Sequence, residues 1–150
     1  KIKSEILKKN NQSLQLELYD NVNVDLFGFI GSDSSGDKFR NVLSKHSINT
    51  DNLITTTQPT ILKSRIIAHQ QHVARLDREP TGAYSKQEAD QLLASIQNSI
   101  SHYQAIIISD YLKGVFTPSS TQNIINIATK HNCPILIDPK GKDYSKIVIR

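Results

Sequence analysis

The fold of this chain is decided by two stretches, Ile106-Ile-Ile-Ser-Asp110-Tyr-Leu-Lys113-Gly114 and Ile135-Leu-Ile-Asp138-Pro-Lys140-Gly141. Each begins with a short apolar run, and such runs on either side of a helical segment are typical of buried parallel strands. The segment between them starts with Thr117-Pro118, an N-cap followed by proline at the first helical position. Residues 104–138 are therefore predicted to form a βαβ unit with a right-handed crossover.

Both predicted strands stop at an aspartate, and a lysine and a glycine follow within a few residues. In open α/β sheets, ligands bind just beyond the carboxyl ends of the strands. Asp110 and Asp138 could accept hydrogen bonds from sugar hydroxyls or position a metal, and Lys113 and Lys140 could contact phosphate oxygens. The alternative is that each aspartate caps local backbone amides after its strand.

The rest of the chain alternates strands and helices. The Gly/Ser/Asp loop at residues 31–36 leads into a helix with Ser35 as the expected N-cap, and Ser85 and Glu88 form a capping box. We expect strands at residues 14–19, 22–30, 53–57 and 147–149, and helices at residues 4–9, 36–46, 85–101 and 117–131. Residues at core spacing on these helices are Phe39, Val42, Leu43, Ala89, Leu92, Leu93, Ile96, Ile100, Ile124, Ile127 and Ala128.

A β-hairpin interrupts this alternation. Residues 60–68 and 72–77 are expected to pair as antiparallel strands, with the polar pair Gln70-Gln71 near the turn. The imperfect alternation of the first strand predicts that both faces are partly covered. An insertion of this kind, here within residues 53–78, is typical of a flap, a lid or a dimer contact, because a lone hairpin is only marginally stable.

Four charged side chains follow the hairpin strands. Lys63 and Arg65 share one face because successive strand residues point to opposite sides, and Arg75 and Asp77 share a face for the same reason. Two cations on one face of a flap suit a phosphate, to which arginine offers a planar fork of donors. The alternative is a salt-bridged face of the sheet in contact with solvent.

Composition and charge narrow the classes of protein and ligand. The 150 residues make up one domain or part of one, and a net charge of +4 mildly favours anionic ligands. The lysines are scattered, with no basic run among aromatic residues, so we expect no nucleic-acid partner. The apolar runs are too short to span a bilayer and there is no signal-peptide core, so we expect no membrane partner and a cytoplasmic location.

Three further features are expected to be structural or incidental. Cys133 precedes Pro134 at the start of an apolar strand, and is expected to be a small buried side chain rather than a nucleophile. His69 and His72 flank the hairpin turn with no third ligand in view, so no metal is assigned to them. The chain begins at Lys1 and contains no methionine, from which we expect it to be a fragment of a longer protein.

Five segments together resemble the ribokinase-like (PfkB) carbohydrate kinases, in the order that this family has them and over roughly residues 24–146. Within the family the likeness is greatest to the heptose-7-phosphate kinases, for which the Arg-Leu-Asp-x-Glu and Ser-Asp-Tyr-x-Lys-Gly patterns are the more specific. The segments are Phe27-Gly-Phe-Ile-Gly-Ser-Asp-Ser-Ser-Gly36, Pro59-Thr-Ile-Leu-Lys-Ser-Arg65, Gln70-Gln-His-Val-Ala-Arg-Leu-Asp-Arg-Glu79, Ile108-Ser-Asp-Tyr-Leu-Lys-Gly114 and Ile137-Asp-Pro-Lys-Gly141.

The resemblance implies a partial ribokinase-like α/β sandwich, with a mostly parallel sheet and a β-hairpin lid through which two copies form a homodimer. It implies phosphoryl transfer from ATP, with Mg²⁺, to a hydroxyl of D-glycero-D-manno-heptose 7-phosphate, a step in ADP-heptose synthesis for lipopolysaccharide. Such chemistry depends mainly on positioning and charge stabilisation. The residues expected to bind the phosphorylated sugar are Lys63, Arg65, Arg75, Asp77, Asp110 and Lys113, and those expected to bind the nucleotide are Asp138 and Lys140.

The chain also departs from the family pattern. Residues 10–21 do not match the family's Gly-Gly-x-x-x-Asn sugar motif, and no Gly-Ala-Gly-Asp segment, which carries the family's catalytic base, occurs in these residues. We therefore assign no catalytic residue and no metal ligand, and expect the isolated chain not to turn over substrate. The alternatives are a non-catalytic dimerisation or binding module and a kinase for another sugar. With part of the sheet missing, the strand at residues 135–138 is expected to expose apolar surface.

Overall fold

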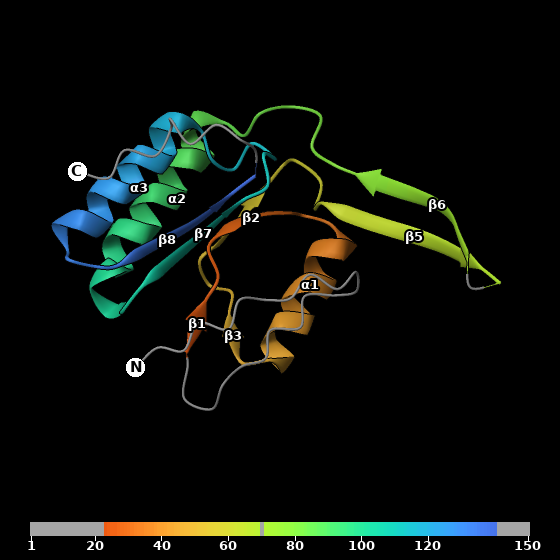
Figure 1. Ribbon diagram of the computed structural model, residues 1–150, viewed down its shortest axis with the longest axis horizontal. Coiled ribbons are helices and arrows are strands. Elements are labelled where there is room, and N and C mark those ends of the chain that lie inside the picture. Colours follow the sequence, from red (N-terminus) through yellow and green to blue (C-terminus); the bar gives the residue numbers. More distant parts are fainter. Residues whose placement is uncertain (1–22, 70, 141–150) are drawn as a thin grey trace.

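The computed structural model describes residues 23–69 and 71–140, which form an α/β body and a projecting hairpin (Figure 1). Within this part of the chain the strands pair two by two, in parallel for three pairs and antiparallel for the hairpin. The strands are β1 (Val24–Asp25), β2 (Gly28–Gly31), β3 (Ile48–Asn49), β4 (Leu53–Thr56), β5 (Leu62–Ala68), β6 (Gln71–Arg78), β7 (Ile106–Asp110) and β8 (Ile135–Pro139). The helices are α1 (Ser34–Lys45), α2 (Lys86–Ser99) and α3 (Pro118–Lys130), and α2 continues into a 3-10 turn, η1 (Ile100–His102).

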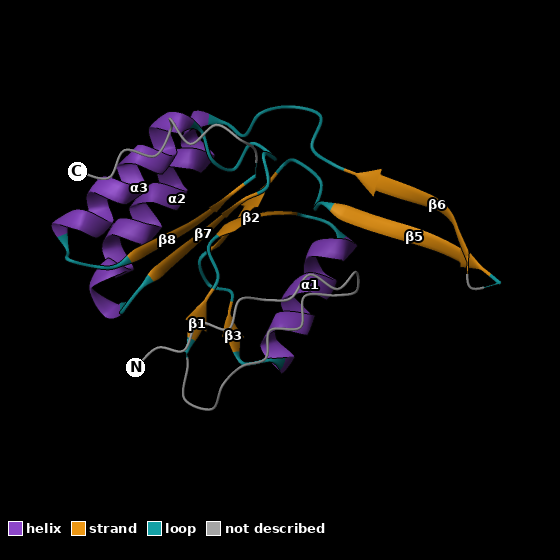
Figure 2. Cartoon of the chain, viewed as in Figure 1, coloured by secondary structure: helices purple, strands orange, loops and turns teal. Residues whose placement is uncertain are grey.

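The βαβ unit is confirmed. β7 and β8 pair in parallel from Ile106 opposite Ile135 to Asp110 opposite Pro139, and α3 connects them. The Thr117 hydroxyl accepts a hydrogen bond from the Ser120 amide at the start of α3, with Pro118 in the first turn. Helices α2 and α3 lie together on one face of this strand pair (Figure 2).

The core of this half of the molecule forms where α2 and α3 meet the sheet. The capping box of Ser85 and Glu88 starts α2 as predicted, and the buried residues of this helix pack in the core cluster. The buried side chains of this cluster are Leu92, Ile96, Ile108 and Ile124, and a neighbouring cluster contains Ile100, Ala128 and Cys133. Burial raises the pKa of the Cys133 thiol, in keeping with the expected structural role.

The single strand predicted at residues 22–30 is wrong, because the segment forms two strands. β1 pairs with β3, whereas β2 pairs with β4, and the chain changes partner between them at Leu26 and Phe27. The amide of Leu26 still donates to the carbonyl of Asn49 at 2.9 Å. The break therefore reflects a change of neighbouring strand, which hydrophobic periodicity does not reveal.

The start of α1 also differs from the prediction. The N-cap is Asp33 rather than Ser35, because the Asp33 carboxylate accepts a hydrogen bond from the amide of Gly36 at 2.9 Å. Leu43 is buried against Ile30 and the neighbouring strands, but Phe39 is 40% exposed and Val42 is 52% exposed. Only part of the predicted apolar face of this helix is thus buried.

The hairpin of β5 and β6 is confirmed as an antiparallel pair, with an irregularity between Ile66 and Ile67. It extends away from the α/β body (Figure 1). The expectation that both faces are partly covered is wrong: Leu62, Ile66 and Leu76 are 42%, 46% and 61% exposed. The register places these three residues on one face of the hairpin, which makes that face apolar and open to solvent.

The face of β7 and β8 that α2 and α3 do not cover is exposed, as the sequence predicts. Ile107 is 72% exposed and Leu136 is 52% exposed, and the two lie opposite each other in the strand register. The expected helix at residues 4–9 and the expected strands at 14–19 and 147–149 lie outside the described residues. No helix within residues 23–69 and 71–140 combines the length and apolar character needed to cross a membrane.

Candidate functional site

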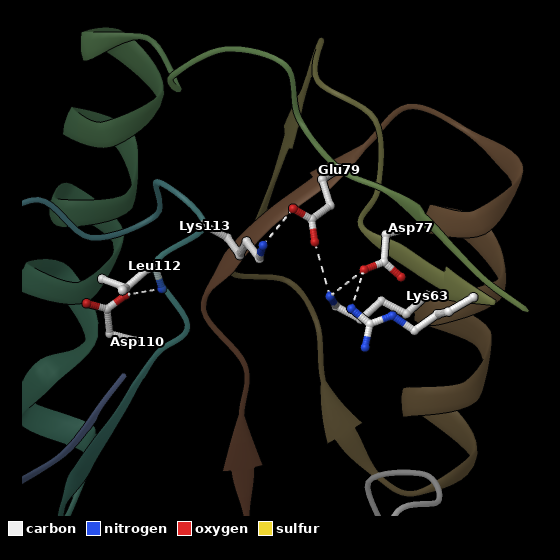
Figure 3. Close-up of polar contacts among 7 residues, drawn as sticks. Lys63, Asp77, Glu79, Asp110, Leu112 and Lys113 are labelled. Atoms are coloured by element: carbon white, nitrogen blue, oxygen red, sulfur yellow. Dashed lines mark hydrogen bonds and ion pairs between the residues drawn. The ribbon is translucent and has the colours of Figure 1, made fainter. Parts of the chain in front are cut away.

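An ionic network joins the base of the hairpin to the loop that follows β7 (Figure 3). Lys63 lies opposite Asp77 in the hairpin register, and its ammonium group is 3.3 Å from the Asp77 carboxylate and 3.1 Å from Glu79 Oε1. Arg75 contacts the same carboxylate of Asp77 at 2.7 Å. Lys113, from the loop after β7, contacts Glu79 Oε2 at 2.6 Å. Glu79 therefore bridges two lysines from different parts of the chain.

The charges of this network reinforce one another. The hydrogen bond from Arg75, followed by that from Lys63, lowers the pKa of Asp77, and Lys113 does the same for the pKa of Glu79. In return, Glu79 and then Asp77 raise the pKa of Lys63. In this network three cationic side chains meet two carboxylates, so one formal positive charge is in excess.

The charged face of the hairpin has features of both predicted alternatives, a salt-bridged face and a phosphate-binding face. Lys63, Arg75 and Asp77 form the salt-bridged face that the alternative predicted, with side chains between 25% and 56% exposed. The register also places Arg65 directly opposite Arg75, so the face gathers several cations that suit a phosphate. Phosphate binding by these residues stays a prediction.

The loop after β7 has a special backbone geometry. Asp110 Oδ1 accepts a hydrogen bond from the amide of Leu112 at 2.8 Å, which is the local capping that the alternative predicted. Leu112 has a φ of 55° and Gly114 a φ of 81°, both in the left-handed region. For a bulky residue such as leucine this conformation is uncommon and costs energy. The resulting turn brings the neighbouring Lys113 to Glu79.

The two residues expected near the nucleotide lie at the end of β8. The amide of Lys140 donates to the carbonyl of Asp110 at 2.8 Å, so the ends of β7 and β8 are held side by side. The side chains of Asp138 and Lys140 are exposed and take part in no ion pair within residues 23–69 and 71–140. The structure therefore brings them near Asp110 but does not connect them to the ionic network.

A second set of contacts fixes the base of the hairpin to the start of α1. Besides capping the helix, Asp33 accepts hydrogen bonds from the amide of Thr60 at 3.0 Å and from the Arg78 guanidinium at 3.1 Å. The amide of Gly31 donates to the Thr60 hydroxyl at 3.0 Å. The backbone donors Gly36 and Thr60, followed by the nearby Arg78 charge, lower the pKa of Asp33 to about 2.

Sequence reasoning missed the importance of Glu79 and Asp33. Glu79 is two residues beyond Asp77, so strand alternation could have placed both on one face, but it stood in an expected loop. Asp33 is a favourable N-cap residue, yet Ser35 competes for that role two residues later. In each case the deciding partner, Lys113 or Thr60, lies more than 25 residues away.

The described residues supply little of a metal or nucleotide site. Among them, no group of three or more His, Cys, Asp or Glu side chains could hold a metal ion. Lys140 can offer one positive charge to a nucleotide phosphate from its exposed position after β8. These residues therefore assign no role to Mg²⁺. An expectation that ATP and Mg²⁺ are used depends on the family of the chain alone.

Comparison with known proteins gives the family. The model of the pfkB family of carbohydrate kinases matches residues 10–149. This chain belongs to the pfkB family. The predicted resemblance and the predicted ribokinase-like fold are thereby confirmed.

Two curated relatives show how the chain compares with longer proteins. The bifunctional protein HldE of Aliarcobacter butzleri is 43% identical over 124 residues, which are 82% of this chain and 26% of that protein. HldE of Haemophilus influenzae is 40% identical over 126 residues, 84% of this chain and 26% of that protein. The chain thus spans about a quarter of the length of the curated relatives it matches.

Solved pfkB-type structures share the fold at low sequence identity. The PfkB protein of Polaromonas sp. JS666 aligns with a TM-score of 0.60 at 11% identity, covering 81% of this chain and 41% of that one. The fructokinase of Xylella fastidiosa aligns with a TM-score of 0.60 at 16% identity, covering 81% and 37%. These structures support the α/β architecture, and at such identities they say nothing about the sugar.

Proposed function

We propose that this chain forms part of an ATP-dependent kinase domain that phosphorylates D-glycero-D-manno-heptose 7-phosphate, a step toward ADP-heptose. The observation that carries the proposal is the convergence of Lys63 and Lys113 at the hairpin base, next to the end of β7. Similarity to two HldE proteins at 40–43% identity supports a heptose rather than another sugar. A kinase for another sugar is the alternative within the same family.

The residues divide into two groups in this proposal. Lys63, Arg65, Arg75 and Lys113 offer cations to the sugar phosphate, while Asp77 holds Lys63 and Arg75 in place. Asp110 stands at the end of β7, where one carboxylate oxygen caps Leu112 and the other can accept a sugar hydroxyl. This division follows from the ends of strands being the ligand-binding edge of such sheets.

Asp138 and Lys140 are proposed to lie on the nucleotide side. Bound ATP supplies the phosphoryl group, and Lys140 would contribute one cation toward its phosphates. No Gly-Ala-Gly-Asp segment occurs in the 150 residues, so we assign no catalytic base and propose that the isolated chain does not turn over substrate. We further propose a cytoplasmic location, where ATP is available.

Binding of the sugar phosphate tests this proposal. In a calorimetric titration, wild-type chain is expected to bind heptose 7-phosphate with one site, and Lys113→Gln is expected to weaken binding about tenfold by removing a charge-assisted contact. Lys86→Gln is the matched control, since Lys86 pairs with Asp90 on α2. Equal affinities of Lys113→Gln and wild type, or no binding by wild type, would count against the proposed site.

We also propose that two copies pair through the apolar face of the hairpin. Leu62, Ile66 and Leu76 form this face and are all more than 40% exposed in a single chain. Apolar surface gathered on a projecting hairpin is expected to be covered by a partner. Light scattering during gel filtration should give a dimer for wild type and a monomer for Leu76→Asp; a wild-type monomer at high concentration contradicts the pairing.

A further inference from the structure

The Glu79 carboxylate occupies an unusual position at the base of the hairpin. One oxygen contacts Lys63 of β5 at 3.1 Å and the other contacts Lys113 of the loop after β7 at 2.6 Å. In Figure 3 both lysine side chains point to this carboxylate from opposite sides. We propose that Glu79 is an internal counter-ion, which an oxyanion of the ligand displaces from the two lysines, and that this exchange releases one of the two attachments of the hairpin base.

The geometry of the two lysines supports the exchange. A carboxylate presents two oxygens to the two ammonium groups, and a phosphate presents the same kind of acceptors with more negative charge. An oxyanion that contacts both lysines at once therefore competes with Glu79 for their positive charge and their N–H donors. The inference rests on the proposed sugar-phosphate site, to which it adds the residue that holds the site before the ligand binds.

The surroundings make the displacement inexpensive. The side chains of Lys63, Lys113 and Glu79 are 45%, 30% and 28% exposed, and ion pairs in contact with solvent stabilise a fold only slightly. Glu79 follows the last residue of β6 and precedes α2, so no strand or helix fixes its backbone. A displaced Glu79 carboxylate can accordingly return to water, while Asp77 continues to neutralise Lys63.

The exchange has a mechanical consequence because two adjacent residues hold the end of β6 from two sides. Arg78 binds Asp33 at 3.1 Å and Ser35 at 2.9 Å, at the start of α1. Glu79 accepts a hydrogen bond from Lys113, in the loop after β7. When a ligand takes over Lys113, the hairpin keeps its attachment to α1 and loses its attachment to the β7 loop. The contacts of Asp33 then act as the pivot of the hairpin.

Inorganic phosphate is the probe that tests the exchange with the full chain. We expect Glu79→Gln to bind phosphate about 3–10-fold more tightly than wild type in a ³¹P NMR titration at constant ionic strength, because the internal competitor is lost. Asp90→Asn makes the same change in net charge at the separate Lys86–Asp90 pair, and should stay within about twofold of wild type. Weaker or unchanged binding by Glu79→Gln, or an equal gain in Asp90→Asn, overturns the proposal.

A measurement on the wild-type chain keeps the test independent of how the variants fold. The lysines hold the pKa of Glu79 below its ordinary value of 4.5, so saturating phosphate should raise it back toward that value in ¹³C NMR of the carboxyl group. An unmoved pKa of Glu79 in the phosphate-bound chain overturns the exchange. If phosphate displaces Glu79 but heptose 7-phosphate does not bind, only the proposed substrate is contradicted. If heptose 7-phosphate binds and Glu79→Gln does not change its affinity, only this inference is contradicted.

Discussion

Gly31 lies so close to the segment before the hairpin that Gly31→Ala is expected to destabilise the fold. Replacing a glycine by alanine usually stabilises a protein where the backbone conformation allows it. A Cβ atom at Gly31 would lie 2.5 Å from the nitrogen of Thr60, 2.6 Å from the carbonyl oxygen of Gln58 and 2.9 Å from the carbonyl carbon of Pro59. All three are backbone atoms, so no side chain can rotate away and the segment itself must move. Gly28, at the other end of β2, would place its Cβ 3.9 Å from a methyl group of Leu53, an ordinary contact.

The magnitude follows from three contributions. Forcing extra volume into a packed site costs about 1–3 kcal/mol, and disturbing the hydrogen bond from the Gly31 amide to Thr60 costs about 1 kcal/mol. The reduced freedom of the unfolded chain returns about 0.4–1 kcal/mol. Gly31→Ala is therefore expected to lower the free energy of unfolding by about 2 kcal/mol, which corresponds to a fall in melting temperature of about 4–8 °C.

Urea unfolding followed by circular dichroism measures this difference, with Gly28→Ala as the matched control in the same strand. The midpoint should fall in Gly31→Ala with an unchanged slope, and should stay the same or rise slightly in Gly28→Ala. Equal midpoints of the two variants would contradict the close contact between Gly31 and the segment before the hairpin.

Three further predictions concern stability. Ile124 is 1% exposed, so Ile124→Ala should lower the free energy of unfolding in urea by about 2–5 kcal/mol. Ile107 is 72% exposed, so Ile107→Ala should change that free energy by less than about 0.5 kcal/mol, and equal effects of the two variants would contradict the position of the core. Thr117→Ala removes the N-cap of α3 and should cost about 1 kcal/mol, with exposed Asn123→Ala as the control on the same helix. Because the folded pKa of Asp33 is depressed from 3.8 to about 2, its stabilisation is present above pH 3.8 and is lost as the pH falls toward 2. Thermal melts between pH 4 and 2 should thus show a steeper loss for wild type than for Asp33→Asn, and parallel losses would contradict the role of Asp33.

The parts of the fold that the sequence predicted correctly are local. The capping box at Ser85, the N-cap at Thr117 and the apolar spacing of α2 and α3 each depend on residues within a few positions of one another. The βαβ unit follows from them because two apolar strands joined by a helix have one favoured arrangement.

The parts that the sequence did not predict depend on distant partners. The break between β1 and β2 exists because each half pairs with a different strand, and the charge pattern alone could not show that Glu79 meets Lys113, 34 residues away. The exposed apolar faces of α1 and of the hairpin were not predicted for the same reason. An apolar pattern indicates that a face favours burial, but it does not show whether the described residues cover that face.

A comparison of the affinities of three sugar phosphates tests the central claim most directly. Heptose 7-phosphate, fructose 6-phosphate and ribose 5-phosphate are titrated into the wild-type chain under identical conditions, with the heat of binding as the signal. The proposed function predicts that heptose 7-phosphate binds at least about tenfold more tightly than the other two, a difference of about 1.4 kcal/mol. Equal affinities, or tighter binding of fructose 6-phosphate or ribose 5-phosphate, would contradict the assignment to a heptose and favour a kinase for another sugar.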